Sequence, residues 1–125
     1  MKRNAAKTFL DLQVWQKSHE LTLSIYKFTS CFPKYELYGL SSQMRRASVS
    51  IAANIAEGFK KRSTREKLRF LGIAQSSLEE CRYYLLLTQD LGYGQTGELT
   101  KTLEDTSRLL HGYSGAISVL ECSST

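Results

Sequence analysis

Proline is nearly missing from the sequence: it occurs once in 125 residues, at Pro33. Because proline breaks helices and interrupts central strands, its scarcity permits long regular elements. The chain also lacks low-complexity tracts, and it has no apolar run near the roughly 18 residues that a membrane span requires. We therefore expect one soluble domain covering residues 1–125, long enough to enclose a hydrophobic core.

Cysteine is scarce as well, with an odd and scattered set of three residues, Cys31, Cys81 and Cys122. Such a set favours free thiols in a reducing compartment over a disulfide framework. The N-terminal residues carry charge, but no apolar segment follows them, so no signal peptide is predicted. Together these absences predict a cytoplasmic protein that does not act in a membrane.

Strand-like alternation is absent, whereas four long segments show helical periodicity. They predict an all-α protein built as an antiparallel up-down-up-down four-helix bundle. An N-terminal arm of residues 1–10 should precede the first helix. That helix should begin at Asp11 as its N-cap and end at Pro33, because the residue before a proline leaves the helical region.

The second helix should start at a serine cap, at position 41 or 42, and terminate at Gly58. After a short basic loop, Ser63 and Glu66 match a capping box, in which each side chain satisfies a backbone N–H near the other residue. The third helix should therefore begin immediately after Ser63.

Gly92 is the expected C-cap of the third helix. The fourth helix should run from about Thr96 to Leu120, and residues 121–125 should form a frayed tail. Apolar positions in this last helix keep alternating spacings of four and three, which is the pattern of a heptad seam. This seam should extend over three heptads, and Gly112 and Gly115 should weaken the middle of the helix.

Residues 47–56 of the second helix carry no charge. One face, with Ile51 and Ile55, should enter the bundle core. The rest of the surface is also small and apolar, and a monomer should not leave such a surface to water. Ser50 and Asn54 border the two faces and should bond to neighbouring helices, or else contact a ligand. The predicted oligomer-interface residues are Val49, Ala52, Ala53 and Ala56.

Positive charge is concentrated in the middle of the sequence. Residues 41–70 contain 8 bases and 2 acids, whereas residues 71–125 contain 3 bases and 7 acids. Exposed bases at this density would contact phosphates, which gives affinity for RNA or DNA without reading sequence. The alternative is a solubilising turn whose bases pair with acids. The predicted nucleic-acid-binding residues are Arg45, Arg46, Lys60, Lys61, Arg62, Arg65, Lys67 and Arg69.

Catalytic and metal-binding patterns are missing. His19 and His111 lie in different predicted helices, with no cysteine or carboxylate at ligand spacing. No Glu-x-x-His motif occurs, so the di-iron pattern of helix bundles is missing. Residues 92–97 spell Gly-x-Gly-x-x-Gly, but they follow a helix and not a strand, which predicts a turn. The protein is therefore expected not to be an enzyme and to hold no metal or cofactor.

Several strings in the chain resemble the 23S ribosomal RNA intervening-sequence protein family, whose members are also called four-helix bundle proteins. The matching strings are residues 11–18 (Asp-Leu-Gln-Val-Trp-Gln-Lys-Ser), Phe32-Pro33, Tyr38-Gly39-Leu40, residues 43–47 (Gln-Met-Arg-Arg-Ala), Ser50-Ile51, residues 54–58 (Asn-Ile-Ala-Glu-Gly) and Leu91-Gly92-Tyr93. The resemblance covers about residues 9–93, and the fourth helix matches only in kind.

This resemblance implies an antiparallel four-helix bundle without catalytic activity that assembles into a ring, usually a homopentamer. Genes of the family are often found within inserts of bacterial 23S ribosomal RNA genes, which implies a bacterial source. The family is also similar in fold to the accessory protein of diversity-generating retroelements, a basic pentamer that works with a reverse transcriptase and nucleic acid.

Two functional hypotheses follow. The first is an oligomeric bundle that binds structured RNA, or other nucleic acid, through its basic residues with low sequence specificity. The alternative is a homo-oligomeric scaffold or adapter for another protein, such as one encoded in the same operon, with no role in nucleic-acid binding. Salt separates the two, because phosphate-led binding weakens steeply as salt rises.

Overall fold

The computed structural model describes the backbone of residues 5–123 and the side chains of residues 5–120. Its long elements are four helices, α1 (Gln13–Thr29), α2 (Leu40–Lys60), α3 (Thr64–Asp90) and α4 (Gly97–Ser123). Two single-turn 3-10 helices lie in the connections, η1 (Phe9–Asp11) and η2 (Lys34–Glu36). Across the described residues no strand occurs, so the expectation of an all-α protein with four helices is confirmed.

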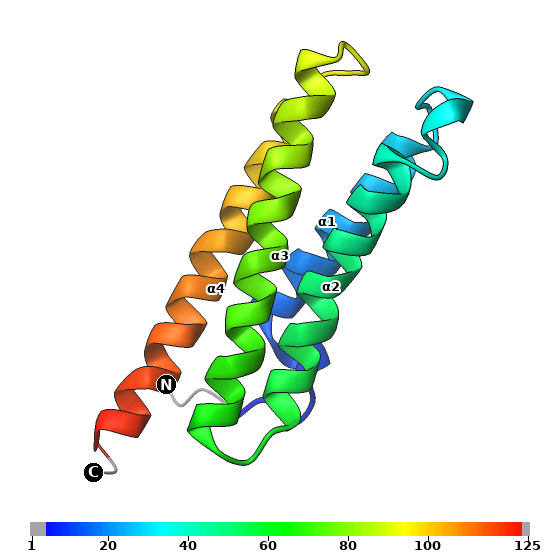
Figure 1. Cartoon of the computed structure of the whole chain (residues 1–125). Helices are drawn as coiled ribbons and strands as arrows, with labels where there is room; N and C mark the ends of the chain where they lie inside the picture. The colour runs from blue at the N-terminus through cyan, green and yellow to red at the C-terminus, as the bar shows by residue number, and fades with distance from the viewer. Residues whose placement is uncertain (1–4, 124–125) are drawn as a thin grey trace.

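Each long helix packs against two others, and together the four enclose one core (Figure 1). The most extensive contact joins α2 to α3. Every helix contributes large apolar side chains that are almost completely shielded from water. These side chains are Leu21, Ile25, Met44, Ile51, Ile55, Leu71, Leu78, Leu85, Leu103 and Leu110. Burial of such side chains contributes roughly 1.5–3 kcal/mol each, so this core is the main source of stability.

Polar groups beside the core are paired between helices. Thr22 donates its hydroxyl proton to the Ser48 carbonyl oxygen at 3.1 Å and links α1 to α2. The hydroxyls of Ser50 and Ser77 lie 2.8 Å apart and link α2 to α3, while Asn54 donates to the Ser50 carbonyl oxygen at 2.8 Å. The expected bond to a neighbouring helix is confirmed for Ser50, whereas Asn54 bonds to Ser50 on its own helix.

The N-terminal end of α1 differs from the prediction. Asp11 does not cap α1: it lies in η1, and its carboxylate accepts the N–H groups of Lys7 (2.9 Å) and Thr8 (3.1 Å). These hydrogen bonds lower the pKa of Asp11. The N-cap of α1 is Leu12, which makes no side-chain capping bond. Residues 1–4 of the predicted N-terminal arm lie outside the described residues, and the arm is helical from Phe9 onward.

The other end of α1 is also shorter than predicted. The helix ends at Thr29, four positions before Pro33, which immediately precedes η2. The N–H groups of Cys31 and Phe32 bond to carbonyls three residues back, so the chain tightens into turns before the proline. Proline therefore bounds the connector and not the helix.

The start of α2 is capped from a distance. The Leu40 N–H donates to a carboxylate oxygen of Glu36 at 3.1 Å, and neither of the two serines that follow caps the helix. Gly58 does not terminate α2, which continues to Lys60. A Cβ at position 58 would lie 3.3 Å from the Lys67 carbonyl oxygen. The glycine therefore permits close approach of α3.

The ends of α3 follow the sequence more closely. Ser63 accepts the Glu66 N–H at 3.1 Å, but the reciprocal half of the capping box is missing because the Glu66 carboxylate pairs with Arg69 at 3.2 Å. At the other end Gly92 has a φ of +76°, and its N–H bonds to the Gln89 carbonyl. With the Tyr93 N–H bonded to Thr88, this is a Schellman motif, so the predicted glycine cap is confirmed.

Along α4 the predicted seam is buried from Leu99 to Leu110, and Tyr113 is half-buried. Leu120, in contrast, is 64% exposed. The backbone is helical through Ser123, whereas the rest of the predicted frayed tail lies outside the described residues, as do the side chains of 121–125. None of the helices in the described part of the chain has both the length and the hydropathy needed to cross a membrane.

A small network of hydrogen bonds links η2 to the turn between α3 and α4. The Tyr93 hydroxyl donates to Glu36 at 2.7 Å and lies 3.2 Å from the Tyr35 hydroxyl. The pKa of Glu36 is lowered, chiefly by the Leu40 N–H and then by the Tyr93 hydroxyl. A carboxylate with a lowered folded-state pKa stabilises the fold above its ordinary pKa, and this stabilisation is lost as pH falls through the folded value.

Removing the Tyr93 hydroxyl should therefore destabilise the protein in a pH-dependent way. In Tyr93→Phe, the melting temperature should fall relative to wild type at pH 7, where Glu36 is charged. The difference should shrink below about pH 4, where the carboxylate becomes protonated. Thermal melts at both pH values test this. Tyr38→Phe is the matched control, because Tyr38 is 92% exposed and should show no difference. If the melting temperature of Tyr93→Phe falls by the same amount at both pH values, the charge of Glu36 does not cause the destabilisation.

Candidate nucleic-acid interface

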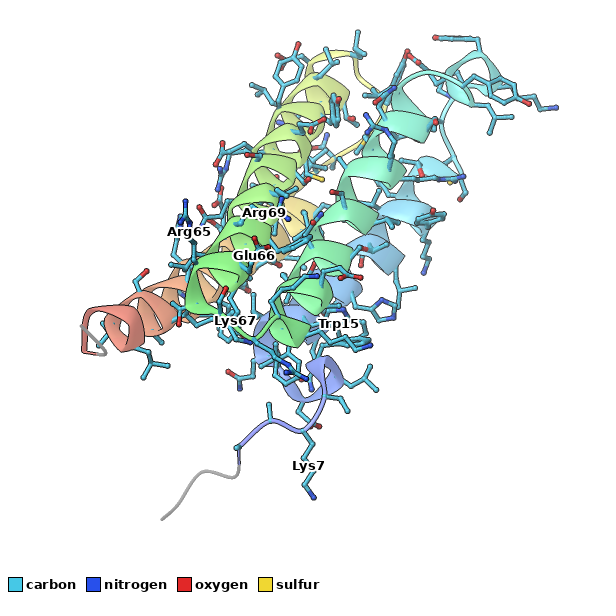
Figure 2. The ribbon with its side chains drawn as sticks, turned by 60° about the horizontal axis from the view of Figure 1, so that its bottom comes forward. Lys7, Trp15, Arg65, Glu66, Lys67 and Arg69 are labelled. Atoms are coloured by element: carbon cyan, nitrogen blue, oxygen red, sulfur yellow. The ribbon has the colours of Figure 1, made fainter. Side chains whose placement is uncertain are left out.

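The basic cluster predicted around residues 60–69 lies at the tight turn between α2 and α3. Only Lys61, Arg62 and Ser63 separate the two helices. Figure 2 shows this end of the molecule brought forward, with Arg65, Lys67 and Arg69 on the first turns of α3. The turn is short because Ser63 starts α3 at once and Gly58 lets α3 approach α2 closely. Six bases therefore share one small region of surface.

Three of the six bases carry charge that no acid compensates. Lys60, Arg62 and Arg65 are exposed. Within the described part of the chain, none of these three side chains has an ion pair or a hydrogen bond. Their cationic groups are therefore hydrated and available to an anion.

Two further bases each form an ion pair with an acid and a cation–π contact with the same aromatic ring. The Lys61 ammonium lies 4.0 Å from a Glu57 carboxylate oxygen and 4.9 Å from the centre of the Phe70 ring. The Arg69 guanidinium pairs with Glu66 and lies 4.6 Å from the same ring. Phe70 thus has two cations within cation–π distance of its ring. These two bases hold less uncompensated charge than their neighbours.

Lys67 has a structural role. Its ammonium donates to the carbonyl oxygens of Phe59 (2.7 Å) and Gly58 (3.4 Å) at the end of α2, and it lies 5.5 Å from the centre of the Phe59 ring. A cation at a helix C-terminus satisfies unpaired carbonyls and complements the helix dipole. Lys67 therefore fastens α3 to α2 and offers little to a ligand.

The structure does not bring Arg45 and Arg46 to this turn. They lie about 20 Å further back along α2, judged from the rise of a helix. Arg45 donates to the Thr29 hydroxyl at 2.8 Å, and its guanidinium lies 4.8 Å from the Tyr26 ring centre. Arg46 is exposed and donates to the Gln43 side chain at 2.6 Å. Arg45 thus joins α1 to α2.

The predicted interface residues of α2 divide between two environments. Val49 is 43% exposed, Ala53 is exposed and Ala56 is half-buried, so these three can meet a partner. Ala52 is only 9% exposed within a single chain, where it already faces neighbouring side chains. A surface for self-association on α2 would therefore consist mainly of Val49, Ala53 and Ala56.

The other chemically suggestive residues are separated or buried. His111 lies 3.3 Å from the Gln75 side chain on the outside of α3 and α4, far along the chain from His19 on α1. Burial raises the pKa of the Cys81 thiol to about 12, which makes it unreactive. Residues 92–96 lie in the turn between α3 and α4, as predicted, and Gly97 begins α4. In the described part of the chain no three potential metal ligands gather.

One feature of this end was missed from the sequence. Phe9, Trp15 and His19 form a stack of rings where η1 packs against α1 and α2. Figure 2 shows Trp15 at the same end of the molecule as the basic turn, with Lys7 beyond it. The four-residue spacing of Trp15 and His19, which places the two side chains on one helix face, was the signal available.

Comparison with known proteins places this fold in a family. Residues 10–113 match the family described as 23S rRNA-intervening sequence protein. The chain belongs to that family. A similar solved structure is a protein of unknown function from the S23 ribosomal protein family of Bacteroides thetaiotaomicron. It is 26% identical, with a TM-score of 0.68, and the alignment covers 83% of this chain and 97% of that one. No curated protein matches the chain.

The contrast between Lys67 and Arg65 predicts that their replacement has unequal effects on stability. Lys67→Met should lower the free energy of unfolding by about 1 kcal/mol or more, because two carbonyls at the end of α2 lose a charged donor. Arg65→Met, which removes the same charge from the same turn, should change it by less than about 0.5 kcal/mol. Urea denaturation of both variants measures the difference. Equal losses would mean that Lys67 does not fasten the two helices.

Proposed function

We propose that this protein binds structured RNA, or other nucleic acid, through the α2–α3 turn and does so without catalysis. The observation that supports this most is the uncompensated charge of Lys60, Arg62 and Arg65, beside Lys61 and Arg69, on one exposed turn. Lysine and arginine side chains on a protein surface neutralise phosphates and release the counterions condensed on the nucleic acid.

Binding of this kind would have low sequence specificity. Contacts to phosphates position a protein on nucleic acid, whereas contacts to base edges carry the sequence information. Arg62 and Arg65 could each hold a phosphate through two parallel hydrogen bonds, since the guanidinium fork matches the geometry of phosphate oxygens. The family description, which refers to the intervening sequence of 23S rRNA, makes ribosomal RNA the first ligand to try.

Reversing the three uncompensated charges should abolish binding. The variant Lys60→Glu/Arg62→Glu/Arg65→Glu should lose at least about 100-fold in affinity for a fragment of 23S ribosomal RNA at low salt. The slope of log affinity against log salt should also become shallower, because fewer phosphates are neutralised. Fluorescence anisotropy across a salt series measures both quantities.

The matched control carries the same change in net charge elsewhere. Lys27, Lys34 and Lys101 are exposed and have no ion pair within the described residues, and none of them lies at the α2–α3 turn. The variant Lys27→Glu/Lys34→Glu/Lys101→Glu should retain most of the affinity. If the two triple variants lose affinity equally, net charge and not the turn would govern binding.

A second candidate function is a homo-oligomeric scaffold, favoured by the apolar outer face of α2. Val49 and Ala53 leave apolar surface open to water there. We propose that the bundles, with α1 to α4 in up-down-up-down order, join through this face into a ring, for which a homopentamer is the expected size. The ring would act in the cytoplasm, in keeping with the free thiols of Cys31 and Cys81. A protein encoded in the same operon would be its partner.

A charge placed on that face should break the assembly without unfolding the chain. Ala53→Glu should reduce the mass measured by light scattering to that of the monomer, while the circular dichroism of the bundle persists, because Ala53 is exposed. Ala116→Glu on the exposed side of α4 is the control and should keep the wild-type mass. An Ala53→Glu variant with unchanged mass would exclude this face as the interface.

A further inference from the structure

Three aromatic rings from two elements stack at the basic end of the molecule. The Phe9 ring meets the Trp15 ring edge-on, with centroids 4.9 Å apart and planes at 62°. On Trp15 the His19 imidazole lies nearly parallel, with centroids 4.9 Å apart and planes at 12°. Trp15 is half-buried and packs against the core, which fixes the position of the stack.

His19 is the outer member of this stack. It is exposed, and within the described residues it makes no hydrogen bond and no ring contact other than the one with Trp15. A parallel stack uses one face of the imidazole, so the opposite face has no ring contact within the described residues and can take a further flat ring. An aromatic ring held rigidly on the surface, with one face free, suits a base that has left its own stack.

The ring stack lies at the same end of the molecule as the bases of the proposed site. η1, which supplies Phe9, packs against both α1 and α2, and α2 ends at Lys60 beside the basic turn. Figure 2 shows Trp15 near the end of α2 at the end of the molecule that also carries Lys67 and Arg65. Four acids lie in this region: Asp11, Glu20, Glu57 and Glu66. Glu20 is paired with Lys17, and Glu66 is paired with Arg69. Glu57 is paired with Lys61, and Asp11 is bonded to backbone N–H groups.

We propose that His19, supported by Trp15 and Phe9, is a stacking platform for an unpaired base of the nucleic acid held by the α2–α3 turn. The inference rests on the proposed function and narrows its ligand class, from nucleic acid in general to strands with unpaired nucleotides. Bases within a duplex are already stacked on each other and cannot reach a ring on a helix surface, whereas loops and bulges can. Every base has a flat face, so the platform requires no particular sequence.

Trp15 makes the inference measurable, because it is the sole tryptophan of the chain. Three probes of about ten nucleotides should be compared: a single-stranded oligouridylate, an abasic strand of the same length, and a blunt RNA duplex. In wild type, the oligouridylate should quench Trp15 fluorescence at saturation. The abasic strand and the duplex should bind through their phosphates with little quenching.

The decisive variant is His19→Ala. Its affinity for the oligouridylate, measured by anisotropy, should fall about fivefold or more, the loss expected for one stacked base. Affinity for the duplex and the abasic strand should stay within about twofold of wild type. His19→Phe should restore the affinity for the oligouridylate, since a flat ring is what the platform supplies. The matched control His111→Ala removes the other histidine of the chain and should bind all three probes like wild type.

The outcomes separate the platform from the proposed function. If wild type binds all three probes equally without quenching, or if His19→Ala binds the oligouridylate like wild type, the platform is excluded while phosphate binding stands. If His19→Ala weakens all three probes together, His19 acts through the fold and the platform is again excluded. If wild type binds no probe even at low salt, the proposed function itself fails, and the platform fails with it.

Discussion

The packing of α2 against α3 is the constraint on which the candidate interface depends. These helices share the most extensive contact of the bundle, and at its end Gly58 lets the α3 backbone approach within a distance that a larger residue would obstruct. The same approach forces six cations into one turn, where they repel each other. Lys67 offsets part of that repulsion by binding carbonyls at the negative end of the α2 dipole, and two more cations lie within cation–π distance of the Phe70 ring. Burial of the apolar core compensates for the rest of this repulsion.

The helices were predictable because their apolar spacing persists over many turns, so the assignment of a helix does not depend on any single residue. The buried positions of α2 and α4 follow that spacing from Leu40 to Ile55 and from Leu99 to Leu110. The helix ends were less predictable, since each depends on one local competition. The first N–H of α2 bonds to Glu36 of the preceding connector and not to the adjacent serines. Glycine often terminates a helix, but Gly58 lies inside α2, where the lack of a side chain allows α3 to pack closely.

The candidate site was predictable as a cluster but not as a set of roles. Residues 60–69 are basic in sequence and remain together in space, because a turn of three residues keeps its flanks adjacent. Which bases are free depends on partners several residues away, such as the carbonyls that engage Lys67. Arg45 and Arg46 fell in the same charge block but lie on a distant part of α2, where Arg45 bridges to α1. The ring contact of Phe9 with Trp15 depends on the path of η1, which periodicity does not describe.

The uneven distribution of charge along the chain also has a consequence for how a partner arrives. The α2–α3 turn holds the densest group of bases, six of the 17 in the chain, whereas the second half of α3 and α4 hold most of the acids, including Glu79 and Glu104, which share Arg82. The molecule is therefore an electric dipole whose positive pole is the turn. In dilute salt a polyanion would feel this field before touching the surface, and the field would rotate the protein during the approach. The first collision would then favour the end that carries Arg62 over the long sides of the helices.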